Sequence, residues 1–242
     1  MWQELALAFS FLTVLPMPMV EYQAGLLGRA GRWFPVVGLV IGGLLTAAHG
    51  VLSQLFPPLL TAGLVIALWA VLTGALHLDG LADCCDGLLA PTSRERRLEI
   101  MRDPRTGAFA VVGLVLFLLV KVTALAAVPS AIPALLLAPT WARWLLLWVA
   151  RQPLARPGGL GADFAAGLTG RTLLGALILP LLLCLVFSTL QLLAAMAFAL
   201  GVTLAVIYMA RSRLGGVTGD VYGLAVELGE LAVLLVYAAN WT

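Results

Sequence analysis

An apolar run from Leu59 to Leu76 ends directly on the acidic stretch His77-Leu78-Asp79-Gly80-Leu81-Ala82-Asp83-Cys84-Cys85-Asp86-Gly87. Three of the chain's twelve acidic residues fall within this short stretch. Asp79, Asp83 and Asp86 follow an i, i+4, i+7 spacing, which places them on one face of a helix. Like charges gathered near a membrane repel one another strongly unless a cation lies among them. The stretch therefore predicts a divalent-metal site at the mouth of a membrane helix.

The composition places this stretch in a membrane protein. Hydrophobic residues make up 62% of the 242 residues and charged residues only 11%, whereas about 25% of a soluble domain is charged. Several apolar runs reach the roughly 20 residues that cross a bilayer as a helix. The sequence predicts an all-α, polytopic membrane bundle that forms a single domain over residues 1–242. Its expected surroundings are the lipid bilayer, and we expect no nucleic-acid partner.

Seven membrane spans are predicted after an amino-terminal helix. Residues 1–20 are apolar but interrupted by Pro16 and Pro18, so we expect a short interfacial or re-entrant helix there. Glycines at a spacing of four, as at Gly38 and Gly42, indicate close helix packing in the first span. The predicted spans are 33–55, 59–76, 107–128, 134–150, 172–190, 192–210 and 221–239.

The basic residues predict the orientation of the bundle. Thirteen of the fourteen are arginine, and nearly all lie in the connections 21–32, 88–106, 151–171 and 211–219. The alternate turns carry none. By the positive-inside rule, the arginine-bearing connections face the cytoplasm. We therefore expect a multi-pass protein of the cytoplasmic (inner) membrane, with the acidic stretch open to the cytoplasm.

A second acidic group opens the last span. Asp220, Glu227 and Glu230 are spaced i, i+7, i+10 on one helix face, and intramembrane carboxylates indicate a functional site. The glycine-rich segment 215–219 precedes Asp220, and its backbone N–H groups are suited to approach a phosphate. The two acidic groups are predicted to meet in one cytoplasmic site.

Six carboxylates in such a site suit one or two Mg²⁺ ions, which prefer oxygen ligands and substrate phosphates. The expected metal ligands are Asp79, Asp83, Asp86 and Asp220. The expected catalytic residues are Glu227, Glu230, Asp220, Arg102 and Arg105, with a glutamate as general base and the arginines on phosphate. Contacts to substrate or cofactor are expected from His77, Arg32, Arg143 and Gly219.

Structural alternatives remain open for several of these side chains. Glu227 and Glu230 could pair with a buried arginine. Lys121 lies inside a span and could snorkel or pair with a carboxylate. Arg143 lies between Trp141 and Trp144 and could stack on an aromatic ring instead of binding phosphate.

The chain resembles the cobalamin synthase family, also called adenosylcobinamide-GDP ribazoletransferases. The segments that carry the resemblance are Phe34-Pro35-Val36-Val37-Gly38, His77 to Gly87, Glu99 to Gly107, Thr218-Gly219-Asp220 and Glu227-Leu228-Gly229-Glu230. The resemblance implies transfer of cobinamide phosphate from adenosylcobinamide-GDP to α-ribazole or its 5′-phosphate, with release of GMP. It also implies Mg²⁺ as cofactor. Whether identical subunits assemble is left open.

Three other classes share part of this pattern. A CDP-alcohol phosphatidyltransferase also binds a nucleotide diphosphate through carboxylates, but its Ala-Arg pair does not follow Asp83-Cys84-Cys85-Asp86-Gly87. A membrane prenyltransferase has aspartate-rich motifs but not the downstream segment with Arg102 and Arg105. A cation-coupled transporter would use intramembrane Glu227 and Glu230 and show an inverted repeat, which is not detected here.

Overall fold

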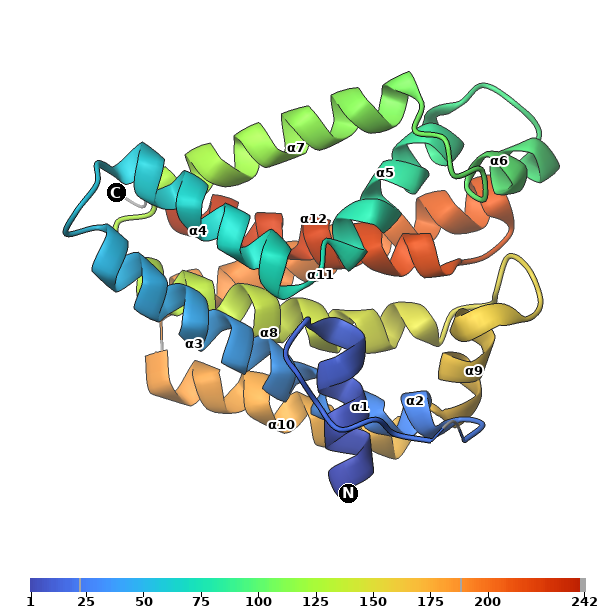
Figure 1. Cartoon of the computed structure of the whole chain (residues 1–242), viewed down its shortest axis with the longest axis horizontal. Coiled ribbons are helices and arrows are strands. Elements are labelled where there is room, and N and C mark those ends of the chain that lie inside the picture. Colours follow the sequence, from blue (N-terminus) through green and yellow to red (C-terminus); the bar gives the residue numbers. More distant parts are fainter. Residues whose placement is uncertain (22, 188, 240–242) are drawn as a thin grey trace.

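The computed structural model describes residues 1–21, 23–187 and 189–239, and within these ranges the chain is helical with no strand. This confirms the predicted all-α membrane bundle (Figure 1). Six helical segments are long and apolar enough to cross a membrane. They are Leu26–Leu52, Ala108–Ala127 (α7), Ala131–Ala150 (α8), Gly170–Phe187 (α10), Leu190–Leu214 (α11) and Gly219–Ala238 (α12).

The remaining span is broken, and the acidic stretch forms its second half. Helix α4 (Pro58–Leu72) and helix α5 (Leu76–Leu89) meet at 94°, a sharp bend visible in Figure 1. At 1.5 Å per residue α4 is about 22 Å long, shorter than the roughly 30 Å of a bilayer core. Gly74 and Ala75 turn the chain with positive φ angles of 59° and 54°. The predicted continuous span 59–76 is thus corrected to a helix that ends at Leu72.

The amino-terminal segment forms a short helix of its own. Helix α1 (Trp2–Leu12) has 11 residues, which is too few to cross a bilayer. It crosses the bundle at a steep angle in Figure 1 and contacts α2 (Leu26–Ala30) and α3 (Phe34–Leu52). The 3₁₀ turn η1 (Gly31–Trp33) links α2 to α3.

Helices α8 and α12 form the centre of the bundle. Both are about four-fifths buried, whereas α7 and α10 expose most of their apolar side chains at the periphery. Because those exposed faces are strongly apolar, lipid chains suit them. The core of the molecule therefore lies where α3, α8, α11 and α12 pack together.

Glycines allow the closest helix contacts, as the spacing of four predicted. An alanine Cβ at Gly38 would lie 2.4 Å from the carbonyl oxygen of Pro139, and one at Gly42 would lie 2.5 Å from that of Leu135. Both contacts join α3 to α8. Gly43, one position further, faces open space. The small residues thus determine how closely α3 approaches the central helix.

The arginine-bearing connections gather at one end of the bundle. Helix α6 (Arg94–Ile100), helix α9 (Gly159–Gly167) and the turn between α11 and α12 all lie at that end in Figure 1. Backbone hydrogen bonds join two of these connections, between Ala155 and Val217 (2.9 Å) and between Val217 and Pro153 (2.9 Å). Acidic helix α5 runs toward the same end.

Candidate active site

The crossing of α5 and α12 brings Asp220 close to the aspartates of α5. A Cβ at Gly80 would lie 2.8 Å from the Asp220 carbonyl oxygen, and one at Gly223 would lie 2.8 Å from the His77 carbonyl oxygen. The two backbones therefore touch beside Asp79 and Asp220. Helix α12 begins here because the Thr218 hydroxyl accepts the Val221 N–H at 3.4 Å and donates to Asp220 at 3.1 Å. Asp79 and Asp220 line one cavity, and Asp83 lies within reach of the Asp220 charge, so the predicted proximity of the α5 aspartates to Asp220 is present.

A polar cavity of about 320 Å³ lies on one side of α5, and we call it the phosphate cavity. The charged residues around it are Asp79, Asp83, Asp86, Arg102, Asp103 and Arg105. Both arginines expected to bind phosphate thus share a cavity with the aspartates. Arg105 donates to Asp103 at 2.6 Å, and this bonding lowers the pKa of Asp103 to about 2. Because its side chain is 85% exposed, Arg105 is free to exchange that partner for a substrate anion.

Asp86 also has a structural role at the edge of this cavity. Its carboxylate accepts the Gly107 N–H at 2.6 Å and the Ala110 N–H at 2.9 Å. These N–H groups belong to the first turn of α7, where a helix has unpaired donors and attracts a negative charge. Asp86 therefore anchors the amino end of α7 to α5.

Asp83 is surrounded by other carboxylates. It lies close enough to Asp220, Asp79 and Asp86 for their charges to repel its own, and Arg156 is the nearby compensating cation. Within the part of the chain that the structure describes, no hydrogen-bond donor reaches its side chain. Arg156 also lies 3.7 Å from Asp220. Sequence reasoning missed Arg156, since the connection 151–171 resembles the family least.

A second cavity lies on the other side of Asp79. We call it the aromatic cavity, and its volume is about 180 Å³. Its polar residues include His77, Asp79, Asp220 and Tyr222. Gly219 also lines it, whereas Gly216 packs against the backbone at Pro153 and Ala155. In the glycine-rich segment that was predicted to approach phosphate, Gly219 therefore lines a cavity, whereas Gly216 packs against backbone.

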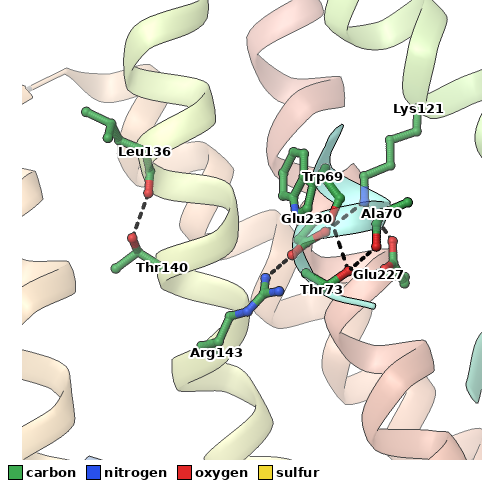
Figure 2. A network of polar contacts seen from close by, with 9 residues as sticks. All are labelled: Trp69, Ala70, Thr73, Lys121, Leu136, Thr140, Arg143, Glu227 and Glu230. Carbon is green, nitrogen blue, oxygen red and sulfur yellow. Dashed lines mark hydrogen bonds and ion pairs between the residues drawn. The ribbon is translucent and has the colours of Figure 1, made fainter. Parts of the chain in front are cut away.

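The two glutamates of α12 lie in a separate, buried network (Figure 2). Lys121 of α7 donates to Glu227 and to Glu230, at 2.7 Å in each case. Arg143 of α8 pairs with the other oxygen of Glu230. The network is almost solvent-free, with Arg143 and Glu230 fully buried and Glu227 3% exposed. The negative charges of the two carboxylates are matched by the positive charges of Lys121 and Arg143.

This network corrects the predicted six-carboxylate site. Glu227 and Glu230 line neither the phosphate cavity nor the aromatic cavity. The structural alternative, pairing with a buried cation, describes their contacts. Lys121 likewise pairs with carboxylates, as its alternative predicted. Arg143 pairs with Glu230, whereas Trp141 and Trp144, on which it could have stacked, stack on each other. The reason is physical, because unpaired charges at this depth would be costly.

Arg32 also lies away from the aspartates. It pairs with Glu4, as does Arg29 at 3.9 Å. These residues border a larger cavity of about 550 Å³, which is formed between α1, the start of α3 and α10. Since none of the aspartates of α5 borders it, size alone does not locate the acidic site.

The aspartates suit a hard divalent cation. Among the residues that the structure describes, no three carboxylate, imidazole or thiol groups converge as a ready-made metal cage. Mg²⁺ commonly binds through one or two carboxylates and completes its shell with water and substrate phosphates. Asp79 and Asp83 offer such a pair beside Arg102, while both oxygens of Asp86 bind α7. The donor chemistry therefore fits Mg²⁺ bound together with a phosphate substrate.

Fold and site together define a class: a polytopic helical membrane protein with an aspartate–arginine cavity between the second half of a broken span and the connection that leads into α7. Residues 4–238 match the family described as Cobalamin-5-phosphate synthase. The chain belongs to this family.

Curated relatives agree with this assignment over nearly the whole chain. The adenosylcobinamide-GDP ribazoletransferase of Pseudomonas paraeruginosa is 46% identical, with 98% of each chain covered. That of Desulfitobacterium hafniense is 38% identical, with 96% of this chain and 95% of the relative covered. The Roseiflexus enzyme of the same name is also 38% identical, covering 94% and 86%. No solved structure matches the chain significantly.

Proposed function

We propose that this protein transfers the cobinamide-phosphate group of adenosylcobinamide-GDP to α-ribazole or α-ribazole 5′-phosphate and releases GMP. The observation that carries the proposal is the position of Asp79. It borders both the phosphate cavity, with Arg102 and Arg105, and the aromatic cavity, with Asp220. A diphosphate donor and a nucleoside acceptor could therefore meet at one carboxylate.

The donor diphosphate binds in the phosphate cavity. Arg102 and Arg105 offer planar guanidinium groups, which pair with phosphate oxygens through two hydrogen bonds at once. Asp79 and Asp83 are the residues that would hold Mg²⁺ in this cavity. When bound there, Mg²⁺ neutralises charge on the phosphate oxygens and so favours attack at phosphorus.

The reaction exchanges one P–O bond for another. A ribose hydroxyl of the acceptor attacks the phosphorus that carries cobinamide, and the bond from that phosphorus to the GMP oxygen breaks. Asp220 takes the hydroxyl proton, because it borders the acceptor side and not the phosphate cavity. Arg156 lies 3.7 Å from Asp220 and places a positive charge beside the carboxylate that accepts the proton.

The proposed location is the cytoplasmic membrane, with this site open to the cytoplasm. The arginine-bearing connections support the orientation, since all of them lie at the end of the bundle toward which α5 runs. A soluble nucleotide-bearing donor could then enter directly from the cytoplasm.

The test is GMP release from isolated membranes that contain the protein. Adenosylcobinamide-GDP, α-ribazole and Mg²⁺ are added together, and each is then omitted in turn. We expect GMP and a cobalamin product only with all three, and loss of both when EDTA removes the metal. GMP release without α-ribazole would indicate a hydrolase instead. Cation uptake into vesicles with no GMP release would favour the transporter alternative.

A further inference from the structure

The aromatic cavity has a chemical character that the proposed reaction does not yet use. Its walls are largely apolar and include Phe11 of α1, Phe164 of α9 and Tyr222 of α12. The rings of Phe164 and Tyr222 meet edge to face, with centroids 6.1 Å apart and planes at 73°. Such a wall suits a flat aromatic ligand, because rings gain from stacked and edge contacts.

The cavity also contains unused hydrogen-bonding capacity. Tyr222 is 8% exposed and His77 is 3% exposed, and both line the cavity. In the described part of the chain, the Tyr222 hydroxyl and His77 Nδ1 are buried without a hydrogen-bond partner. Buried polar atoms are nearly always paired. Two such atoms at one cavity indicate that a ligand supplies the missing partner.

Size and polarity select among the groups that the substrates carry. Pockets for whole drug-sized ligands measure about 300–1,000 Å³, so a cavity of about 180 Å³ suits one ring system and excludes a corrin. Guanine presents several donors and acceptors along its edges, and in a mainly apolar cavity most of them would lose their partners. The dimethylbenzimidazole of α-ribazole is a flat apolar bicycle with a single free ring nitrogen.

We infer that the aromatic cavity binds the base of the acceptor nucleoside, an inference that rests on the proposed function. The base lies against Phe164 and Tyr222, and its free ring nitrogen pairs with a buried donor, the Tyr222 hydroxyl or His77. The ribose then lies toward Asp79 and Asp220 at the border with the phosphate cavity. The cavity thus selects the acceptor and directs its hydroxyl to the donor.

Two mild substitutions test the site without disturbing the fold. Tyr222→Phe removes a hydroxyl that has no protein partner. Gly161→Ala adds a methyl group to the cavity wall, 3.5 Å from the Tyr222 hydroxyl oxygen, which is an ordinary contact distance. The matched control is Gly201→Ala on α11, where an added Cβ meets nothing within 4 Å.

The measurement is equilibrium binding of α-ribazole alone to the purified full-length protein, with no donor present. We expect Tyr222→Phe to weaken binding about fivefold, as for one lost hydrogen bond, and Gly161→Ala about tenfold or more through crowding. A riboside of benzimidazole without the two methyl groups should regain affinity in Gly161→Ala. The control Gly201→Ala and the binding of guanosine 5′-diphosphate should be unchanged.

Other outcomes overturn the inference. If both variants bound α-ribazole with wild-type affinity, the base would not bind in this cavity. Selective loss of guanosine 5′-diphosphate binding would assign the cavity to the donor's guanine. Because binding is measured without turnover, these results are distinct from failure of the proposed function, which would appear as absence of GMP release while α-ribazole still binds.

Discussion

At the scale of single residues, Asp83 and Asp86 lie three positions apart on α5 and affect the stability of the fold in opposite ways. Asp86 stabilises the fold, whereas the charge of Asp83 destabilises it. Asp86 satisfies two N–H groups at the start of α7. Asp83 faces three other carboxylates and, within the described residues, accepts no hydrogen bond. Groups that are costly to the fold but retained at a cavity are typical of functional sites.

We therefore expect Asp83→Asn to abolish turnover while leaving thermal stability unchanged or raised, because it removes like-charge repulsion. Asp86→Asn should lower stability by about 1–2 kcal/mol, since an amide cannot accept both helix N–H groups. Thermal unfolding in detergent and GMP release measure the two effects. An Asp83→Asn protein with near-normal turnover would exclude Asp83 as a metal ligand.

The buried network gives a second prediction at this scale. Glu230→Gln leaves Lys121 and Arg143 with Glu227 as their one remaining carboxylate. Breaking a buried ion pair on one side costs about 3–5 kcal/mol. We expect a correspondingly large drop in the midpoint of thermal unfolding, which is measured by tryptophan fluorescence.

The matched control for this prediction keeps the charges balanced. The double variant Lys121→Met with Glu227→Gln removes one cation and one anion and leaves the Arg143–Glu230 pair. It should be more stable than Glu230→Gln alone. If Glu230→Gln instead unfolds like the wild type but fails to release GMP, Glu230 acts in catalysis and the structural assignment is wrong.

At the scale of helices, the contact of α5 with α12 decides where Asp220 lies. Gly223→Ala would place a Cβ 2.8 Å from the His77 carbonyl oxygen, a distance that real Cβ atoms do not adopt against backbone. We expect the helices to separate, with loss of turnover and of stability. Gly229→Ala, on the same helix, has its nearest neighbour at 3.7 Å.

Gly229→Ala is thus the internal control for that experiment. Alanine is favoured over glycine inside a helix by about 0.5–1 kcal/mol, so this variant should be as stable as the wild type or more so. Thermal unfolding and GMP release compare the two. Equal behaviour of Gly223→Ala and Gly229→Ala would show that the close crossing does not position Asp220.

These helices also show how far the sequence alone could lead. The number of spans and the acidic faces follow from local periodicity, which the apolar runs and the i, i+4, i+7 spacing display directly. The break at Gly74 was hidden, because the apolar run continues through it to Leu76. The partners of Glu227 and Glu230 could not be assigned, since Lys121 and Arg143 lie more than eighty residues away in the chain.

At the scale of the whole molecule, charge is separated along the bundle. Apart from Lys121 and Arg143, which pair with glutamates, the basic residues belong to the predicted connections 21–32, 88–106, 151–171 and 211–219. Helices α6 and α9 and the turn between α11 and α12 lie at the end toward which α5 runs (Figure 1). This one asymmetry serves two needs. It favours the proposed orientation through the positive-inside rule, and it provides the positive charge that the proposed phosphate site needs at its entrance.

The orientation gives the last prediction, which uses single cysteines in a background with Cys84, Cys85 and Cys184 replaced by alanine. Ser130→Cys lies in the arginine-free turn between α7 and α8, and Ser212→Cys lies at the arginine-bearing end of α11; both positions are exposed. In right-side-out vesicles, a membrane-impermeant maleimide should label Ser130→Cys at once. Ser212→Cys should react only after permeabilisation.

The cysteine-free background must first release GMP as the wild type does, because Cys84 and Cys85 lie beside Asp83 on α5. Inverted vesicles supply the reciprocal measurement, in which Ser212→Cys reacts and Ser130→Cys does not. The reversed pattern would put the arginines outside, against the positive-inside rule. The phosphate cavity would then open away from the cytoplasm. A cytoplasmic donor would have to cross the membrane before it could reach Arg102 and Arg105.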